Sequence, residues 1–130
     1  MAALSDYAEK LLLDFLMTTG SATRPTAWYV ALFTAAPSDS GGGTEVSTGG
    51  YARQSVSFDA ASSPGGTTSN SGEVSFTASG ADYGTVTHMG IFDAASSGNL
   101  LWHGALTASK TVADGDTLTF AVGNIDLTMA

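Results

Sequence analysis

The sequence predicts a mainly β protein: a single-domain antiparallel β-sandwich or barrel with one N-terminal α-helix. Helical spacing of apolar residues is confined to the start of the chain. Apolar and polar residues then alternate in short segments, as in half-buried strands. Gly-, Ser- and Asp-rich turns separate these segments, at a spacing that fits about six to eight strands. The length of 130 residues fits one domain, with the helix in residues 1–20 and the β domain in residues 21–130.

The first predicted element is a helix over Leu4–Met17. Ser5 is a suitable N-cap, and Asp6 and Glu9 fall in the first turn, where the helix dipole favours acidic side chains. Gly20 is the expected stop. The apolar residues at helical spacing are Leu4, Ala8, Leu11, Leu12, Phe15 and Leu16.

Strands account for most of the remaining chain. The segment 27–34 is apolar on both faces, which is typical of a central strand covered on both sides. Asp114-Gly115 predicts a hairpin between the strands on either side of it. Further strands are expected at 51–58, 74–76, 85–92, 99–106, 110–112, 117–122 and 125–129. The predicted core contains Leu12, Phe15, Val30, Leu32, Val56, Phe58, Val74, Phe76, Ile91, Leu101 and Phe120.

The segment Ala35–Gly50 is a long loop rich in Gly, Ser and Thr. A structureless loop of this length is uncommon inside a compact domain and is usually functional or mobile. We therefore expect the core to need this loop and the N-terminal helix least, and one of the two to contact a partner.

The motif FDAASS occurs at 58–63 and again at 92–97. The flanking sequences do not align, so the repeat does not indicate a duplicated domain. Each copy follows an alternating segment, and Asp59 and Asp93 are expected to accept a backbone hydrogen bond two residues on. We predict two equivalent turns rather than a shared calcium site, since each copy supplies one carboxylate.

The charge of the chain argues against several partners. Twelve acidic and four basic residues give a formal net charge of −8, which disfavours binding to nucleic acid. The longest apolar run is interrupted by Asp14 and is too short to span a bilayer, so no membrane partner is expected. The absence of cysteine excludes disulfides and thiolate metal sites.

No pattern of residues indicates catalysis or a cofactor. His88 and His103 lie in predicted neighbouring strands, but two histidines hydrogen-bonded locally explain them better than a metal site. The glycines at 41–43 lack the Lys-Ser/Thr of a phosphate loop, and no serine lies in G-x-S-x-G. The remaining candidate residues have simpler roles. The aromatic residues are expected in the core: Trp28, Tyr29, Phe33 and Trp102. The acidic residues are expected to be solvated charges: Asp39, Glu45, Asp59 and Asp82.

Seven stretches spread along the chain carry a family resemblance. They are LSDYAEKLLLDFL (4–16), WYVALFTAAP (28–37), GGTEVS (42–47), GGYARQSVSF (49–58), YGTVTHMGIFDA (83–94), GNLLWHGAL (98–106) and SKTVADGDTLTF (109–120). Together they resemble a family of small virion proteins of tailed bacteriophages, described as tail-fibre proteins and similar to capsid decoration or cement proteins. The resemblance implies a β domain with an N-terminal helix that binds other virion proteins.

From this resemblance we expect a non-enzymatic structural protein of the virion, assembled in the host bacterial cytoplasm. Because no heptad or collagen-like repeat is present, we favour a capsid decoration (cement) protein on the outer surface of the shell. A tail-fibre or baseplate component, or a carbohydrate-binding β module for the host surface, are the alternatives. The expected partners are the major capsid protein and further copies of the chain, as a trimer. The expected contact residues are Leu4, Tyr7, Leu11, Ser38, Asp39, Gly41, Gly42, Gly43 and Glu45.

Overall fold

The described residues form one helix near the start of the chain and ten strands, as expected for a mainly β fold. The computed structural model describes residues 2–62 and 65–129. Its elements are β1 (Ala3–Leu4), α1 (Asp6–Met17), β2 (Tyr29–Ala35), β3 (Thr44–Glu45), β4 (Gln54–Ser55), β5 (Thr67–Ser69), β6 (Val74–Thr77), β7 (Gly84–Phe92), β8 (Leu100–Val112), β9 (Thr117–Phe120) and β10 (Asp126–Thr128).

The main sheet has the order β1-β8-β7-β2-β3, and β4 also pairs with β2. Every pairing is antiparallel. Strand β2 lies inside this sheet, and Val30, Ala31, Leu32 and Phe33 are all buried. This confirms the prediction of a strand covered on both faces.

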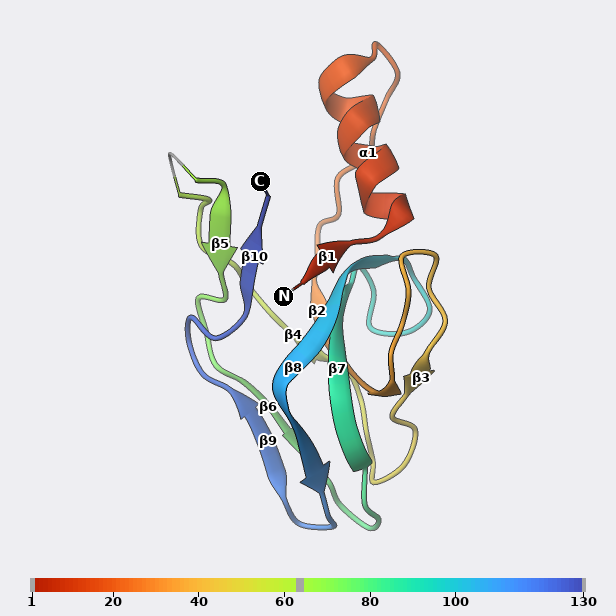
Figure 1. Ribbon diagram of the computed structural model, residues 1–130, viewed down its shortest axis with the longest axis vertical. Coiled ribbons are helices and arrows are strands. Elements are labelled where there is room, and N and C mark those ends of the chain that lie inside the picture. Colours follow the sequence, from red (N-terminus) through yellow and green to blue (C-terminus); the bar gives the residue numbers. More distant parts are fainter. Residues whose placement is uncertain (1, 63–64, 130) are drawn as a thin grey trace.

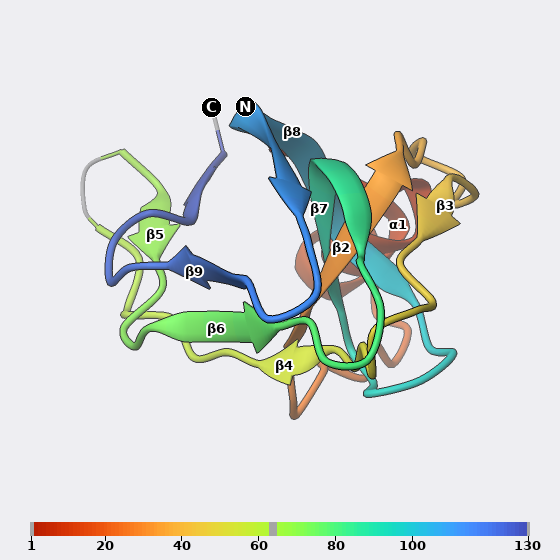
Figure 2. The same cartoon turned by 90° about the horizontal axis from the view of Figure 1, so that it is seen from below.

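Two small two-stranded sheets complete the fold, β6 with β9 and β5 with β10. Figure 2 shows β6 and β9 lying beside one another across from the main sheet. The core lies where the two layers meet, and it includes Val30 and Leu32 from one layer with Phe76 and Leu118 from the other. The arrangement is an open, sandwich-like antiparallel fold, with no closed barrel in residues 2–62 and 65–129.

Helix α1 begins on the main sheet and extends beyond it. Figure 1 shows its first turn next to β1 and β8 and its last turns projecting past the end of the β layers. Ser5 is the N-cap, as predicted, and its hydroxyl accepts a hydrogen bond from the backbone N–H of Ala8 at 3.2 Å. The helix ends at Met17, before Gly20, with Thr18 as C-cap.

The structure confirms seven of the predicted core residues and corrects the others. Phe15 is wrong, because its side chain is 66% exposed on the projecting part of α1. Leu12 on the same helix is half-buried. Phe58 and Phe120 are also half-buried and pack against the edge of the core. The buried residues are Val30, Leu32, Val56, Val74, Phe76, Ile91 and Leu101.

The predicted hairpin at Asp114-Gly115 is wrong, although a turn does form there. The backbone N–H of Asp116 bonds to the carbonyl of Ala113 at 2.9 Å. The strands that the turn joins do not pair with each other, because β8 pairs with β7 and β9 pairs with β6. The turn therefore carries the chain from one layer to the other. The separate strands predicted at 99–106 and 110–112 are one long strand, β8.

The two FDAASS copies are not equivalent turns. Asp93 closes a loop by accepting bonds from the backbone N–H of Asn99 at 2.7 Å and from its side-chain Nδ2 at 3.0 Å. The carboxylate of Asp59 makes no hydrogen bond to a described residue, and the backbone N–H of Asp59 bonds to Ser69 at 3.0 Å. The expected bond two residues on forms in neither copy.

The loop Ala35–Gly50 is built into the fold rather than dispensable. It contains β3, and the backbone N–H of Val46 bonds to the carbonyl of Leu32 at 2.9 Å. Val46 is buried in the core. Gly43 lies so close to Pro37 that a Cβ there would be 2.7 Å from its backbone nitrogen. The expectation that the core needs this loop least is therefore wrong for its second half.

Candidate functional site

The base of α1 is anchored to the first residues of β8. Ser5 is buried, its backbone N–H bonds to the carbonyl of Leu101 at 2.9 Å, and its hydroxyl donates to the carbonyl of Leu100. The same hydroxyl caps the helix. One small side chain thus fixes both where the helix begins and how it leaves the sheet.

The first half of the long loop is anchored to the same place. The backbone N–H of Asp6 bonds to the carbonyl of Asp39 at 2.9 Å, and the Asp39 carboxylate lies 2.7 Å from Nε2 of His103 on β8. Ser38 and Gly41 exchange two backbone bonds of 2.9 Å. The loop is therefore ordered by contacts with both the helix and the sheet.

A hollow of about 670 Å³ lies between the helix base and this loop. Three of its lining residues are acidic, Asp6, Asp39 and Glu45, and two are aromatic, Phe33 and Phe92. The other lining residues are Ser5, Tyr7, Ser40, Gly41, Gly42, Gly43, Gly98, Asn99 and Leu100. The helix and the loop, which the sequence analysis gave as alternative contact elements, thus form one surface.

The predicted contact residues divide between the hollow and its surroundings. Tyr7, Asp39 and Glu45 line it, as do the glycines 41–43. Ser38 belongs to the turn that closes the loop. Leu4 pairs with Trp102 in the sheet, and Leu11 is half-buried on the helix. Leu4 and Leu11 therefore support the helix rather than line the hollow.

Glu45 is not a solvated charge, as the sequence suggested, but part of a partly buried cluster with Tyr51 and Arg53. Arg53 binds both its carboxylate oxygens, through Nε at 2.8 Å and Nη2 at 2.9 Å. The Tyr51 hydroxyl donates to Glu45 at 2.7 Å and accepts from the backbone N–H of Leu32 at 3.0 Å. This cluster ties β3 and the segment before β4 to each other and to β2.

The guanidinium of Arg53 also holds the loop that follows β7. Its Nη1 donates to the carbonyls of Ala94 at 3.0 Å and Ser97 at 2.7 Å. Its carbon lies 3.7 Å from the centre of the Phe92 ring, a stacked cation–π contact. The sequence analysis predicted a strand at 51–58 but did not identify this role of Arg53. The signal in the sequence that could have indicated it is that Arg53 is one of only four basic residues in a chain with twelve acidic ones.

The environment of the cluster shifts the ionisation of its members. Burial alone would raise the pKa of Glu45, but the hydrogen bonds from Arg53 and Tyr51 outweigh it and hold that pKa below the ordinary 4.5. Burial and the hydrogen bond to Glu45 raise the pKa of Tyr51 far above its usual range. Glu45 is thus ionised and Tyr51 is neutral over the whole physiological range of pH.

The two histidines have separate partners. Nδ1 of His88 lies 2.8 Å from the hydroxyl of Thr87, while His103 pairs with Asp39. No serine or threonine hydroxyl in the described residues is hydrogen-bonded to His103, so the pair orients the loop and does not form a nucleophilic triad. Within residues 2–62 and 65–129, no group of three His, Asp or Glu side chains could hold a metal ion.

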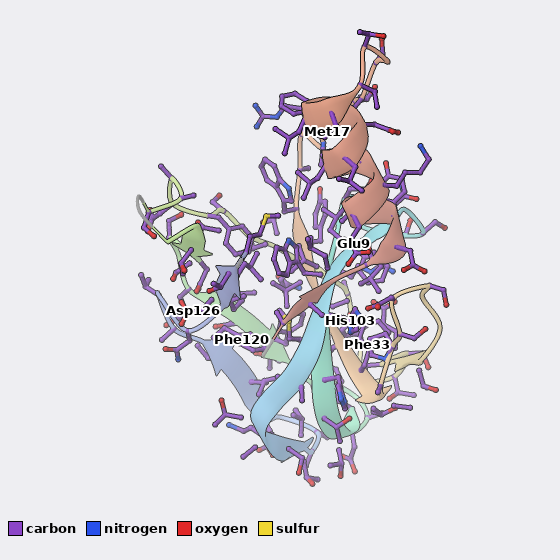
Figure 3. All side chains as sticks on the ribbon, turned by 45° about the horizontal axis from the view of Figure 1, so that its top comes forward. Glu9, Met17, Phe33, His103, Phe120 and Asp126 are labelled. Carbon is purple, nitrogen blue, oxygen red and sulfur yellow. The ribbon has the colours of Figure 1, made fainter. Side chains whose placement is uncertain are left out.

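A second surface lies at the far end of α1, and we call Leu13, Phe15, Leu16 and Met17 the helix tip. Their exposed fractions are 61%, 66%, 67% and 76%. Figure 3 shows Met17 far along the helix from His103 and Phe33 on the β layers. The sequence signal was the run of apolar residues around Asp14 at the end of the helix. Of the four, the sequence analysis assigned Phe15 to the core and left the other three without a place in it. No helix in the described part of the chain is long and apolar enough to cross a membrane.

Residues 3–128 match the model of the family described as podophage GP4 fiber I protein gp80. The chain belongs to this family of phage fibre proteins. It is therefore a structural protein of a tailed-phage virion, as the resemblance implied. A search of curated proteins found no match.

Proposed function

We propose that this protein is a non-enzymatic subunit of the podophage fibre, held in the virion by protein–protein contacts of α1. The observation that carries the proposal is the helix tip, four large apolar side chains on a helix that projects from an ordered β body. Three of them, Leu13, Leu16 and Met17, have the i, i+3, i+4 spacing that places side chains on one side of a helix. Exposed apolar surface of this kind is typical of sites that bind other proteins.

The way in which the helix is held supports the same role. Its base is fixed by Ser5 and by the contact between Asp6 and Asp39, so the tip is presented at a defined angle to the sheet. An element held this way loses little conformational freedom when a partner binds, and that increases affinity. The hollow beside the base offers a second contact surface to the same partner.

A capsid decoration protein is the second candidate. The described residues form β layers and contain no repeated shaft motif of the kind found in fibres. Such a fold would suit a subunit that lies on the shell and binds the major capsid protein. The family match favours the fibre over this location. A carbohydrate-binding role has less support, because the exposed large aromatic side chains in the described residues, Tyr7 and Phe15, lie on α1 rather than in loops.

The test is the position of the chain in intact virions. Gold-labelled antibody fragments against the folded protein would be imaged on purified particles by cryo-electron microscopy. We expect label on the fibres. Label spread over the shell would replace the fibre proposal with decoration, and particles without label or the protein would contradict any structural role.

A further inference from the structure

Strands β8 and β9 diverge from the turn that joins them, as Figures 1 and 2 both show. Among the described residues, β8 pairs with β7 along one edge, and along its other edge it pairs with β1 only at Trp102 and His103. Strand β9 pairs with β6 alone. The rest of the second edge of β8 and one edge of β9 therefore have no strand partner in residues 2–62 and 65–129. The sandwich is open along this side.

A groove of about 540 Å³ lies in this opening. Both strands line it, and Leu106 of β8 and Phe120 of β9 are among the lining residues. These two side chains pack against the core but are only half-buried, so they leave apolar surface in contact with water. The charged residues of the lining are Lys110 and Asp126, one of each sign. The groove is thus uncharged overall, although the chain carries −8, and this favours an uncharged occupant.

The backbone of β8 is irregular where it borders the groove. His88 of β7 pairs with Ala105, but Val86, two residues earlier, pairs with Lys110. The four residues 106–109 of β8 therefore lie opposite a single residue of β7. Such a bulge leaves backbone N–H and C=O groups without partners in the ladder. Those groups need other hydrogen-bond partners, and a strand in the groove would provide them.

The direction of the backbone groups before the bulge follows from β1. The carbonyl of Leu101 accepts a hydrogen bond from the backbone N–H of Ser5 at 2.9 Å, so Leu101 turns its backbone groups away from β7. Because these groups alternate between the two edges of a strand, His103 and Ala105 turn the same way. His103 is paired with Ala3, whereas Ala105 lies beyond the end of β1. Ala105 is thus the first position at which a strand added to β8 would be bound.

From these observations we propose that the groove between β8 and β9 binds an extended, uncharged segment of another virion protein, which pairs with the edge of β8 as an added strand. In recognition of this kind, main-chain hydrogen bonds supply affinity, and pockets for alternate side chains supply specificity. Side chains on one face of the segment cover the exposed parts of Leu106 and Phe120. This inference rests on the proposed structural role and adds a second contact surface, separate from the helix tip.

A second copy of the chain does not suit the groove. Each of the strands β1–β10 is already paired within the chain, so the described residues hold no strand that is free to be donated. The edge of a second β body is also two layers thick, whereas the groove lies between the two layers of the first. A single extended segment is thin enough to enter. A different protein that carries such a segment is therefore the occupant.

The first test compares amide hydrogen exchange of the wild-type chain in purified virions and in the isolated protein, read by mass spectrometry. Amides of residues 104–110 should exchange quickly in the isolated protein, because an exposed edge without a partner opens readily. In virions they should exchange at least tenfold more slowly, since the added strand binds them. Strand β7, which pairs with both β2 and β8, is the internal control and should exchange slowly in both samples.

The second test removes one backbone donor without removing a hydrogen bond to β7. Ala105→Pro lacks the outward N–H, and proline is tolerated on the unpaired edge of a strand. The matched control is Ala105→Val, which also enlarges the side chain but keeps the N–H. The host would produce each variant from a plasmid while the phage supplies the wild type. The ratio of the two proteins in purified particles, divided by their ratio in the lysate, should fall at least tenfold for proline and stay near one for valine.

Equal exchange of residues 104–110 in virions and in the isolated protein, or equal incorporation of the two variants, would overturn the inference. Slow exchange in the isolated protein as well would make a further copy of the chain the occupant, and would overturn it too. If Ala105→Pro does not fold, as seen by circular dichroism, the exchange measurement on the wild type still decides.

The same measurement separates this inference from the proposed function. If amides of the helix tip are protected in virions while residues 104–110 are not, the structural role stands and only the groove contact fails. Particles that lack the chain would contradict both.

Discussion

Replacing Arg53 with alanine should be among the most destabilising changes to a polar side chain of this protein. The guanidinium makes four hydrogen bonds, two to Glu45 and one each to the carbonyls of Ala94 and Ser97, and it stacks on Phe92. Its side chain is only 8% exposed. The truncation removes every one of these contacts and leaves a partly buried carboxylate without its cation.

The expected cost follows from that geometry. Breaking a buried ion pair by removing one partner costs about 3–5 kcal/mol. Glu45 retains 25% exposure and regains some hydration, which places the loss near the lower end, at about 3 kcal/mol. For a chain of this length the melting temperature should fall by about 10 °C. Arg53→Lys keeps the charge but loses the paired geometry, and should cost about 2 kcal/mol.

Urea denaturation followed by tryptophan fluorescence measures these losses as changes of the midpoint at constant slope. Lys10→Ala is the control, because its ion pair with Asp14 is exposed, and removing it should cost no more than about 0.5 kcal/mol. A loss below about 1 kcal/mol for Arg53→Ala would show that the cluster does not join the loops as we describe, since that is the value of one ordinary hydrogen bond.

Two further predictions concern individual carboxylates. Because the pKa of Glu45 is lower in the folded protein than its ordinary 4.5, the stability it contributes is fully present above 4.5 and is lost as the pH falls through the folded value. Glu45→Gln should therefore lose less stability than the wild type when the pH is lowered below 4.5. Melting temperatures that fall equally in the two proteins as the pH is lowered below 4.5 would contradict this. Asp93→Ala should cost about 1–2 kcal/mol because two hydrogen bonds to Asn99 disappear, whereas Asp59→Ala should cost less than about 0.5 kcal/mol. Equal losses in urea denaturation would restore the view that the two FDAASS copies are equivalent.

Several features could be predicted because they depend on neighbours in the sequence. Alternation of apolar and polar residues identified most of the strands, and seven predicted core residues are buried. Ser5 was identified as the helix cap because a cap acts on backbone groups only a few residues away. The order of seven short stretches was enough to recognise the family.

The candidate site was predicted only in part. Tyr7, Asp39 and Glu45 were named, but nothing in the sequence indicates that the loop and the helix base meet around one hollow. Arg53 reaches carbonyls more than forty residues away, at Ala94 and Ser97, so local pattern could not reveal its role. These contacts exist only once β2, β4 and β7 are assembled.

The remaining errors have one physical reason: a local sequence pattern does not determine which distant segment a strand or helix packs against. Asp114-Gly115 did specify a turn, but pairing depends on which strands bury the most apolar surface, and β8 and β9 bury theirs in different layers. Likewise, the spacing of Phe15 specifies a helix face, while its exposure depends on how far the β layers extend along that helix. The sequence by itself determined the class of fold and the kind of each element. Only the tertiary structure decided the strand partners, the partly buried cluster around Arg53 and the exposed helix tip, because these depend on contacts between residues far apart in the chain.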